Sequence, residues 1–416
     1  MHLSRKPLKY SVFLLIALTV LSLSGVVWAA SPVTHTLNQS IAMPAGASVK
    51  VENLVGHMTV TQGNGPLQVT ATVVAGGSQA QALAESIKLD VDTAGNQVTV
   101  HVHYPVDQYD TYLYNPPQAK DARAGAYDNN CFLVFCFNGG SSVKYQGTHV
   151  RVNENSTRGT PLYVDVAVQL PAGAEATLVN PFGRVDARNL ANKLTINTGS
   201  ADIHVTNLTG DLYADTGSGD VHVQGLKGKF KADTGSGDVD AEQVTGDVYA
   251  DTGSGNVNVS NVVSRTLNAD TGSGDVSFNH VKGDMKCDTG SGDCSLVDSI
   301  GSLHADTGSG DVTAKNYISG DSVWADTGSG DVHLSGDLSG LRKLYIDTGS
   351  GEAVLSTSMG LSMHLVASSD SGDVSVNMPS MSNVVIKDSY FSGDLGKAES
   401  QGTISTGSGD IRVSHQ

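Results

Sequence analysis

The stretch LYADTGSGDVHVQGLKG, residues 212–228, decides the fold of this chain, because versions of it recur through the C-terminal half of the sequence. Its central pentad, DTGSG, starts at Asp215, Asp233, Asp251, Asp270, Asp288, Asp306, Asp326 and Asp347. Degenerate copies start at Asn197, Ser368, Ser389 and Ser405. Most successive copies are separated by 18 to 21 residues, a period typical of repeat proteins.

Within one repeat, apolar and polar residues alternate as they do in a half-buried β-strand. Residues 212–216 form one such strand, residues 221–224 form a second, and Gly217-Ser218-Gly219 is the turn between them. We expect glycine in this turn because it reaches positive φ angles that other residues avoid. The side chains predicted to point inward are Leu212, Ala214, Val221, Val223 and Leu226, followed in the next repeat by Phe230, Ala232, Val239 and Ala241.

A single repeat of this length cannot bury its own apolar side chains, whereas stacked repeats share one continuous core. The period therefore predicts an all-β fold, a parallel β-solenoid of about twelve rungs of 18–21 residues, stacked at ~4.8 Å. An antiparallel β-sandwich is the alternative, but it does not explain identical turns at a fixed period.

The sequence divides into four predicted segments. Residues 1–29 are a signal peptide, because basic residues precede an apolar run and small residues follow it. Residues 30–104 are a small β-rich unit with one short helix near 78–87, residues 105–160 an irregular insertion, and residues 161–416 the solenoid. We therefore expect export to the periplasm, the outer membrane or the cell surface, with an uncleaved anchor at residues 1–29 as the alternative.

The charge balance argues against one class of partner. The chain has 25 basic and 42 acidic residues, a net charge of −17, and the predicted signal peptide contains three of the basic ones. A surface of this sign repels nucleic acid and anionic lipid. We expect no nucleic-acid partner and no membrane span after cleavage.

Aspartates flank the repeated turns, and stacking would bring like charges to about 4.8 Å, where they repel by ~1 kcal/mol even in water. One explanation is that the carboxylates accept hydrogen bonds from turn N–H groups, and the other is calcium bound between rungs. Asn197 and Asn256 replace aspartate without its charge, which favours the hydrogen bonds. The candidate calcium ligands are Asp215, Asp220, Asp233, Asp238, Asp270, Asp275, Asp288 and Asp293.

Four cysteines in an exported chain favour disulfides. Cys287 and Cys294 occupy inward sites on either side of one turn, which predicts a disulfide between them; two buried thiols are the alternative. Cys131 and Cys136 bracket four apolar residues and are predicted to pin the tip of a loop.

The insertion at 105–160 is rich in aromatic residues, which offer large and stiff contact area for a glycan or a protein. The alternative is that these rings pack against the rod as a cluster of their own. The candidate ligand-binding residues are Tyr109, Tyr112, Tyr114, Tyr127, Phe132, Phe135, Phe137 and Tyr145.

The sequence favours a protein without catalytic residues. Asp-Thr-Gly-Ser is also the tetrad of pepsin-like proteases, but their chemistry requires two loops that meet and share a proton. Here the copies follow one edge of a rod. His101 and His103 could share a metal ion on one strand face, yet the sequence suggests no third ligand.

The segment VENLVGHMTV at 51–60, LPAGA at 170–174 and the TGSGDV turns resemble the bacterial putative-adhesin family of unknown function, which overlaps the head-GIN auto-transporter-adhesin type. The resemblance covers most of residues 49–416, apart from the insertion. It implies a β-solenoid in the cell envelope, with a role in adhesion or envelope-stress signalling, and it brings no catalytic residues.

Together these observations predict a non-catalytic, exported scaffold that presents residues 105–160 to a glycan or an envelope protein. A calcium-stabilised structural protein is the second hypothesis. Because the last repeat, residues 402–413, runs almost to the end of the chain without a cap, we also expect end-to-end self-association through an open strand edge.

Overall fold

The computed structural model describes residues 32–44, 46–115, 131–132, 135–136, 142–154 and 158–416, without the side chains of residues 131–132 and 135–136. The predicted signal peptide therefore lies outside the described residues. Residues 32–416 form one compact unit.

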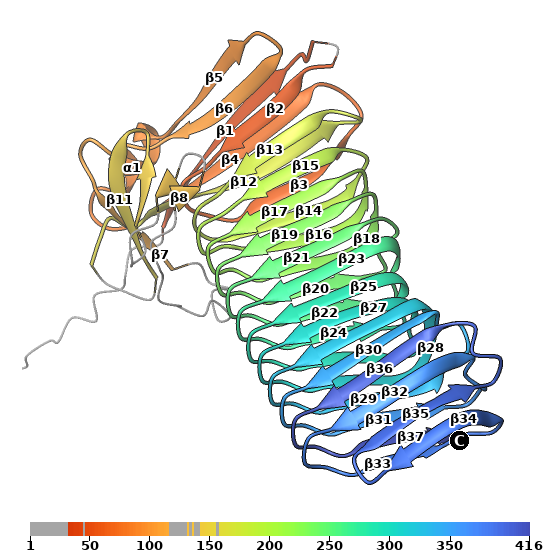
Figure 1. Cartoon of the computed structure of the whole chain (residues 1–416). Coiled ribbons are helices and arrows are strands. Elements are labelled where there is room, and N and C mark those ends of the chain that lie inside the picture. The colour runs from red at the N-terminus through yellow and green to blue at the C-terminus, as the bar shows by residue number, and fades with distance from the viewer. Residues whose placement is uncertain (1–31, 45, 116–130, 133–134, 137–141, 155–157) are drawn as a thin grey trace, which may run out of the picture. The chain divides into compact units, whose positions relative to one another are not determined.

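A 32-stranded, mostly parallel sheet winds around a single core, and its rungs are stacked one on another (Figure 1). The predicted β-solenoid is confirmed. Each rung adds one strand to each of two runs. The first run, in spatial order, is β5 (Lys88–Ala94), β6 (Gln97–His103), β2 (Ser48–Glu52), β13 (Glu175–Val179), β15 (Lys193–Asn197), β17 (Leu212–Thr216), β19 (Phe230–Thr234), β21 (Val248–Thr252), β23 (Val263–Thr271), β25 (Lys282–Thr289), β27 (Ile300–Thr307), β28 (Val312–Thr327), β30 (Lys343–Thr348), β36 (Gln401–Thr406), β32 (Met363–Ser369), β35 (Tyr390–Leu395) and β34 (Met381–Lys387).

The second run faces the first across the core. In spatial order it is β1 (Val33–Ile41), β4 (Leu67–Ala75), β12 (Leu162–Pro171), β3 (Met58–Gly63), β14 (Arg184–Leu190), β16 (Asp202–Thr209), β18 (Val221–Lys227), β20 (Val239–Glu242), β22 (Val257–Ser260), β24 (Val276–Asn279), β26 (Cys294–Val297), the first half of β28, β29 (Val332–Asp337), β31 (Ala353–Thr357), β37 (Ile411–His415) and β33 (Val374–Asn377).

The core is the set of inward side chains that the alternation predicted. Leu212, Ala214 and Val221 are each exposed by 2% or less, and their equivalents in the next rungs are buried in the same way. Strand partners are in register, so that Leu212 lies beside Phe230 and Val221 beside Val239. Each rung therefore covers the apolar edge of its neighbour, as a solenoid requires.

The glycines of the repeated turn are needed for a reason different from the one predicted. Gly217 and Gly219 do not have the positive φ angles that we expected. A Cβ on Gly219 would instead lie 2.1 Å from the carbonyl oxygen of Ala201, and one on Gly237 would lie 1.9 Å from that of Gly219. The rungs approach so closely at this corner that only glycine fits.

The threonine of the repeat ties neighbouring turns together. The Thr252 hydroxyl donates to the carbonyl oxygen of Gly237 in the preceding rung at 2.9 Å and accepts from the N–H of Gly255 in its own turn at 3.1 Å. Ser369 makes the same two contacts in its degenerate copy. The hydroxyl thus satisfies two buried backbone groups, which would be expensive to leave without partners.

The N-terminal β-rich unit is part of the same stack. Strand β2 pairs in parallel with β13, and β3 pairs in parallel with β14, so residues 48–63 form a rung. Antiparallel partners then end the stack, because β1 pairs with β4 and β5 pairs with β6. The one short helix, α1 (Ala80–Ser86), lies within the predicted range. No helix of the described residues is long and apolar enough to cross a membrane.

A second, smaller sheet comes from the insertion. It consists of β7 (Thr111–Tyr114), β10 (Ser142–Tyr145) and β11 (Thr148–Glu154), in which β11 pairs in parallel with β7 and antiparallel with β10. A two-stranded ribbon of β8 (Cys131–Phe132) and β9 (Phe135–Cys136) also belongs to this segment.

The C-terminal repeat does not lie at the end of the rod, and the expectation that it forms the open end is wrong. Strand β36 lies between β30 and β32, and β37 lies between β31 and β33. In the degenerate copy that starts at Ser389, residues 390–394 belong to strand β35, which is antiparallel to both β32 and β34. The stack therefore ends on β33 and β34 (Figure 1).

The close approach of the rungs gives a direct test. Gly255→Ala would place its Cβ 1.9 Å from the carbonyl oxygen of Gly237, so we expect it to lower the free energy of unfolding by about 2–4 kcal/mol. Gly65→Ala is the matched control, because a Cβ there has no neighbour within 4 Å and the change should be near zero. Urea denaturation of both variants measures the difference, and equal stabilities would contradict this account of the turn.

Candidate binding face on the first run of strands

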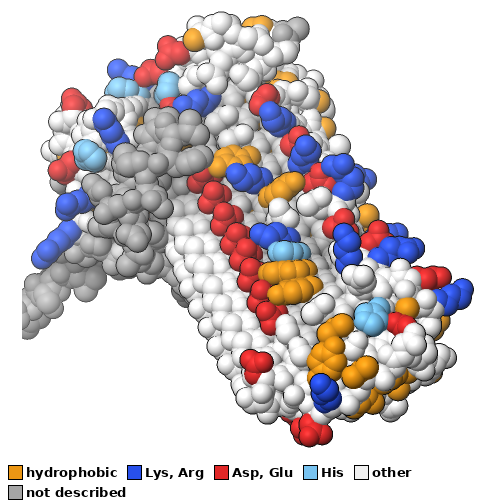
Figure 2. All heavy atoms as spheres, viewed as in Figure 1, with side chains coloured by type: hydrophobic (Ala, Val, Ile, Leu, Met, Phe, Trp, Pro, Cys, Tyr) orange, Lys and Arg blue, Asp and Glu red, His pale blue; other side chains and the backbone are white. Residues whose placement is uncertain are grey.

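The outer side of the first run carries two rows of side chains, which together we call the ladder face. The acid row consists of the first aspartates of the repeats, Asp215, Asp233, Asp251, Asp270, Asp288, Asp306, Asp326 and Asp347. The mixed row lies two residues earlier on each strand and consists of Tyr213, Lys231, Tyr249, Asn268, Lys286, His304, Trp324 and Tyr345. Figure 2 shows a line of acidic side chains beside hydrophobic and basic ones.

Contacts within the ladder face join the two rows. The Tyr213 hydroxyl donates to the Asp215 carboxylate at 3.1 Å, and Lys286 Nζ lies 3.1 Å from that of Asp288. Along the mixed row, Lys231 Nζ lies 5.2 Å from the centre of the Tyr213 ring, which is a cation–π contact.

The carboxylates of the acid row repel one another. Burial and then the neighbouring Asp233 raise the pKa of Asp215, and burial followed by Asp288 and Asp251 raises that of Asp270. Lys231 and Lys286 offset part of this effect. Ionisation of these carboxyl groups in the folded protein is therefore less favourable than in the unfolded chain.

The second aspartate of each repeat has a different role. The Asp220 carboxylate accepts the backbone N–H of Asp238 in the next rung at 2.9 Å, and Asp238 accepts that of Asn256 at 2.8 Å. Asn256 continues the series with its own side-chain oxygen, which accepts the N–H of Asp275 at 2.9 Å. These bonds run between rungs, whereas we expected them within one turn.

Calcium binding by the two aspartate rows stays a prediction. The candidate ligands separate into the acid row, with Asp215, Asp233, Asp270 and Asp288, and the hydrogen-bonded row, with Asp220, Asp238, Asp275 and Asp293. Among the described residues there is no group of three or more His, Cys, Asp or Glu side chains placed to hold a metal ion. A melting temperature that neither EDTA nor millimolar calcium changes would contradict the prediction.

The candidate aromatic residues of the insertion are mostly buried where the structure describes them. Tyr112, Tyr114 and Tyr145 are exposed by 0, 7 and 4%, and Tyr109 is partly exposed. The Tyr145 hydroxyl donates to the carbonyl oxygen of Val102 at 2.6 Å, which ties the small sheet to the solenoid. Tyr127 and Phe137, and the side chains of Phe132 and Phe135, lie outside the described residues.

Disulfides were predicted for two pairs of cysteines. Cys287 and Cys294 form a disulfide inside one rung, with their Cα atoms 6.3 Å apart, and both are fully buried. Cys131 and Cys136 are opposite each other on β8 and β9, but their side chains lie outside the described part of the structure, so this disulfide stays a prediction.

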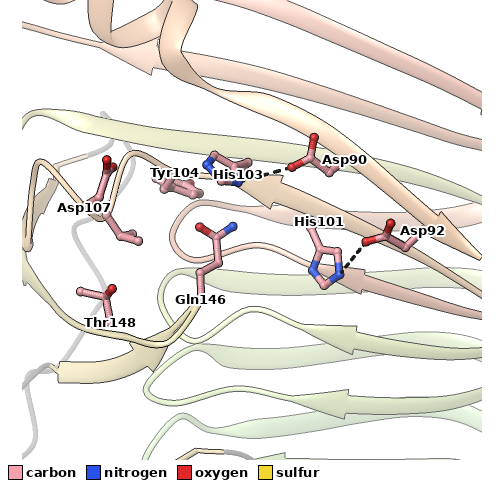
Figure 3. Close-up of a pocket in the computed structure, with 9 residues that line it drawn as sticks. Asp90, Asp92, His101, His103, Tyr104, Asp107, Gln146 and Thr148 are labelled. Carbon is pink, nitrogen blue, oxygen red and sulfur yellow. Dashed lines mark ion pairs between the residues drawn. The ribbon is translucent and has the colours of Figure 1, made fainter.

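A pocket of about 500 Å³ opens at the N-terminal end of the same run (Figure 3). The side chains of His101 and His103 both line this pocket, and each faces a carboxylate of the neighbouring strand β5. The His103 Nδ1 atom lies 3.3 Å from Asp90, and the His101 Nε2 atom lies 3.9 Å from Asp92. The two histidines are therefore partners of separate carboxylates.

The structure also contains an ion cluster that the sequence analysis did not detect. His57 Nε2 lies 2.6 Å from the carboxylate of Asp186, which is 2% exposed and is also bound by Arg184 and Arg188 at 3.0 and 3.2 Å. Burial acts to raise the pKa of Asp186, but the hydrogen bonds from His57 and Arg188 and the charge of Arg184 hold it well below its usual range.

The signal for this cluster was a second, shorter internal repeat. The segments NLVGHMTV at 53–60 and NPFGRVDA at 180–187 share Asn and Gly at the same spacing. In the structure the two asparagines meet, because Asn53 donates to Asn180 at 2.9 Å. This pairing stacks β3 on β14 and brings residues 129 positions apart into contact.

Removing one charge from the acid row should stabilise the protein. Asp270→Asn relieves repulsion from Asp251 and Asp288, so we expect the free energy of unfolding to rise by about 0.5–1 kcal/mol at pH 7. The folded-state pKa of Asp270 is raised, which favours its protonated form, so the gain in stability should disappear as the pH falls below about 4.

Asp238→Ala should instead lower the free energy of unfolding by about 1 kcal/mol, because the backbone N–H of Asn256 loses its acceptor. Denaturation curves at pH 7 and pH 3.5 check both, and a destabilised Asp270→Asn would contradict the argument.

Comparison with known proteins gives one family and several distant structures. Residues 165–245 and 226–342 match the family described as Toastrack DUF4097. No curated protein matches the chain. A putative adhesin from Parabacteroides distasonis is 13% identical with a TM-score of 0.35, over 71% of this chain and 98% of that one.

Two further structures are similarly distant. A putative lipid binding protein from Parabacteroides distasonis is 12% identical with a TM-score of 0.33, over 73% of this chain and 97% of that one. A putative adhesin from Bacteroides fragilis is 11% identical with a TM-score of 0.29, over the same shares. These names describe adhesin or binding proteins and not enzymes. The predicted resemblance to a family of unknown function is confirmed over residues 165–342, which match the Toastrack DUF4097 family.

Proposed function

We propose that this chain is a non-catalytic, exported binding protein of the adhesin type, in which the solenoid is a rigid scaffold for contact surfaces. The ladder face is the observation that carries the proposal, because it presents two in-register rows of side chains along eight rungs. Backbone ladders and the close glycine contacts hold each rung to the next, so the spacing of these side chains is set before any partner arrives.

Two features support export. The N-terminal residues 1–29 have the charge and apolar pattern of a signal peptide. The disulfide between Cys287 and Cys294 is of the kind that persists in oxidising compartments such as the periplasm and the cell surface. Cell fractionation, combined with proteolysis of intact cells, distinguishes a periplasmic from a surface location, and a cytoplasmic, uncleaved protein would contradict this part of the proposal.

The 105–160 segment is the second contact surface of the proposed adhesin, for a glycan or an envelope protein. Its described tyrosines Tyr112, Tyr114 and Tyr145 are buried in the core and are therefore not available to a partner. The residues of this segment that we propose to contact the partner are therefore Tyr109 and residues 115–141, between β7 and β10.

Replacing residues 116–141 with a Gly-Ser segment of equal length tests this surface. Because the three buried tyrosines stay in place, the melting temperature of the solenoid should change little. Binding to isolated envelopes or a glycan array should fall at least about tenfold, which corresponds to ~1.4 kcal/mol. The Gly65→Ala variant is the control for handling and folding. Unchanged binding by the replacement variant would rule this segment out as a contact surface.

We propose that end-to-end self-association uses β34 and not the C-terminal repeat. Strand β34 pairs on one side only, with β35, and exposes Val384, Val385 and Ile386 by 38, 50 and 65%. An apolar edge strand of this kind favours pairing with a second copy. Light scattering at high protein concentration should show association that Ile386→Lys removes, and a monodisperse monomer would contradict it.

A further inference from the structure

We infer that the ring of Tyr345, together with the carboxylate of Asp347, binds the ammonium group of a lysine side chain from a partner polypeptide. This inference rests on the proposed binding function and names a chemical class of partner for the ladder face.

The ladder face already contains one such site, and a lysine of the chain fills it. The Tyr213 hydroxyl donates to Asp215 at 3.1 Å, and the ammonium of Lys231, in the next rung, lies 5.2 Å from the centre of the Tyr213 ring. The ammonium group therefore lies over an aromatic face and close to a row of carboxylates, where both interactions favour it.

The same arrangement recurs at Tyr345, but without the lysine. The Tyr345 hydroxyl donates to Asp347 at 3.2 Å, and the Ser405 hydroxyl donates to the same carboxylate at 2.8 Å. The strand partner of Tyr345 in the next rung is Thr403, which stands where Lys231 stands relative to Tyr213. A threonine side chain is short and carries no charge, so it leaves this side of the ring to a ligand.

The rungs on the other side of Tyr345 form a stiff aromatic platform. The ring of His304 stacks on that of Trp324 with centroids 4.1 Å apart and planes at 7°, and Trp324 stacks on Tyr345 at 5.7 Å and 9°. Stacking fixes the orientation of Tyr345 before binding, and the partly exposed rings of Trp324 and Tyr345 offer apolar area to the stem of a lysine. The platform lies beside the acidic line in Figure 2.

The charge of this region also selects a cation. Asp306 and Asp326 precede Asp347 in the acid row. Within the described part of the chain, their carboxylates accept no hydrogen bond and form no ion pair. Burial, followed by the charges of Asp347 and Asp306, raises the pKa of Asp326. Lys343 is on the same strand as Asp347 but forms no ion pair with it among the described contacts. A ligand cation would relieve this repulsion.

Tetralysine amide is a suitable probe, with tetraserine amide at equal ionic strength as the control peptide. In the protein that starts at Ala30, Trp324 is the only tryptophan, so its fluorescence reports on the platform directly. We expect tetralysine to change this fluorescence and to bind one site per chain by calorimetry.

Two reciprocal variants decide the matter. Thr403→Lys supplies the missing lysine from the chain itself, and should weaken tetralysine binding at least about tenfold while raising the melting temperature. Lys231→Thr vacates the site at Tyr213 and should raise the stoichiometry of tetralysine binding from one to two.

Asp347→Asn should weaken tetralysine binding by about tenfold. Asp233→Asn, whose rung carries its own lysine, should have a much smaller effect.

Three results would overturn the inference: no tetralysine binding, an affinity that Thr403→Lys leaves unchanged, or equal losses in Asp347→Asn and Asp233→Asn. The last result would mean diffuse attraction of a polycation to an acidic protein. Each of these failures leaves the proposed adhesin function to its own tests, because replacement of residues 116–141 does not alter the ladder face.

Discussion

The whole structure depends on how closely the rungs approach at the glycine-serine-glycine corner. A row of glycines lies so near the carbonyl oxygens of the preceding rung that a Cβ would overlap them at about 2 Å, as at Gly237 and Gly255. This contact fixes the register of the rungs that carry the Gly-Ser-Gly corner, and the threonine hydroxyls add two bonds per turn in the same place. Because the register is fixed, chemically equivalent side chains form straight rows, and the ladder face follows from the packing of the backbone.

The alternation of residues carried the prediction of the core, because each strand has only two sides and one of them must be apolar. Leu212, Ala214 and Val221 could be assigned in this way without knowledge of their neighbours. The disulfide between Cys287 and Cys294 followed from the same rule, since both cysteines replace inward residues beside one turn. The ladder face was present in the sequence as the residue two positions before each first aspartate, but its meaning depends on stacking, which only coordinates show.

Other features could not be predicted, for physical reasons. The insertion of β36 between β30 and β32 was hidden because all repeats share one register, so a rung fits equally well at several places in the stack. The burial of Tyr112 and Tyr145 depends on the small sheet of the insertion, whose strands are far apart in sequence. The cluster around Asp186 likewise joins residues more than a hundred positions apart. The alternation of apolar and polar residues does not report such contacts, and only the Asn and Gly spacing shared by residues 53–60 and 180–187 points to the cluster around Asp186.

The placement of β36 and β37 has a consequence for how the chain reaches its native state. A solenoid whose rungs follow one another in sequence can grow from one end as it leaves the ribosome. Here the rung of β32 and β33 is synthesised before the one that separates it from β30 and β31. It can contact its native neighbour only after residues 401–415 have been made, so a segment that follows β32 and β33 in the chain completes the interior of the rod.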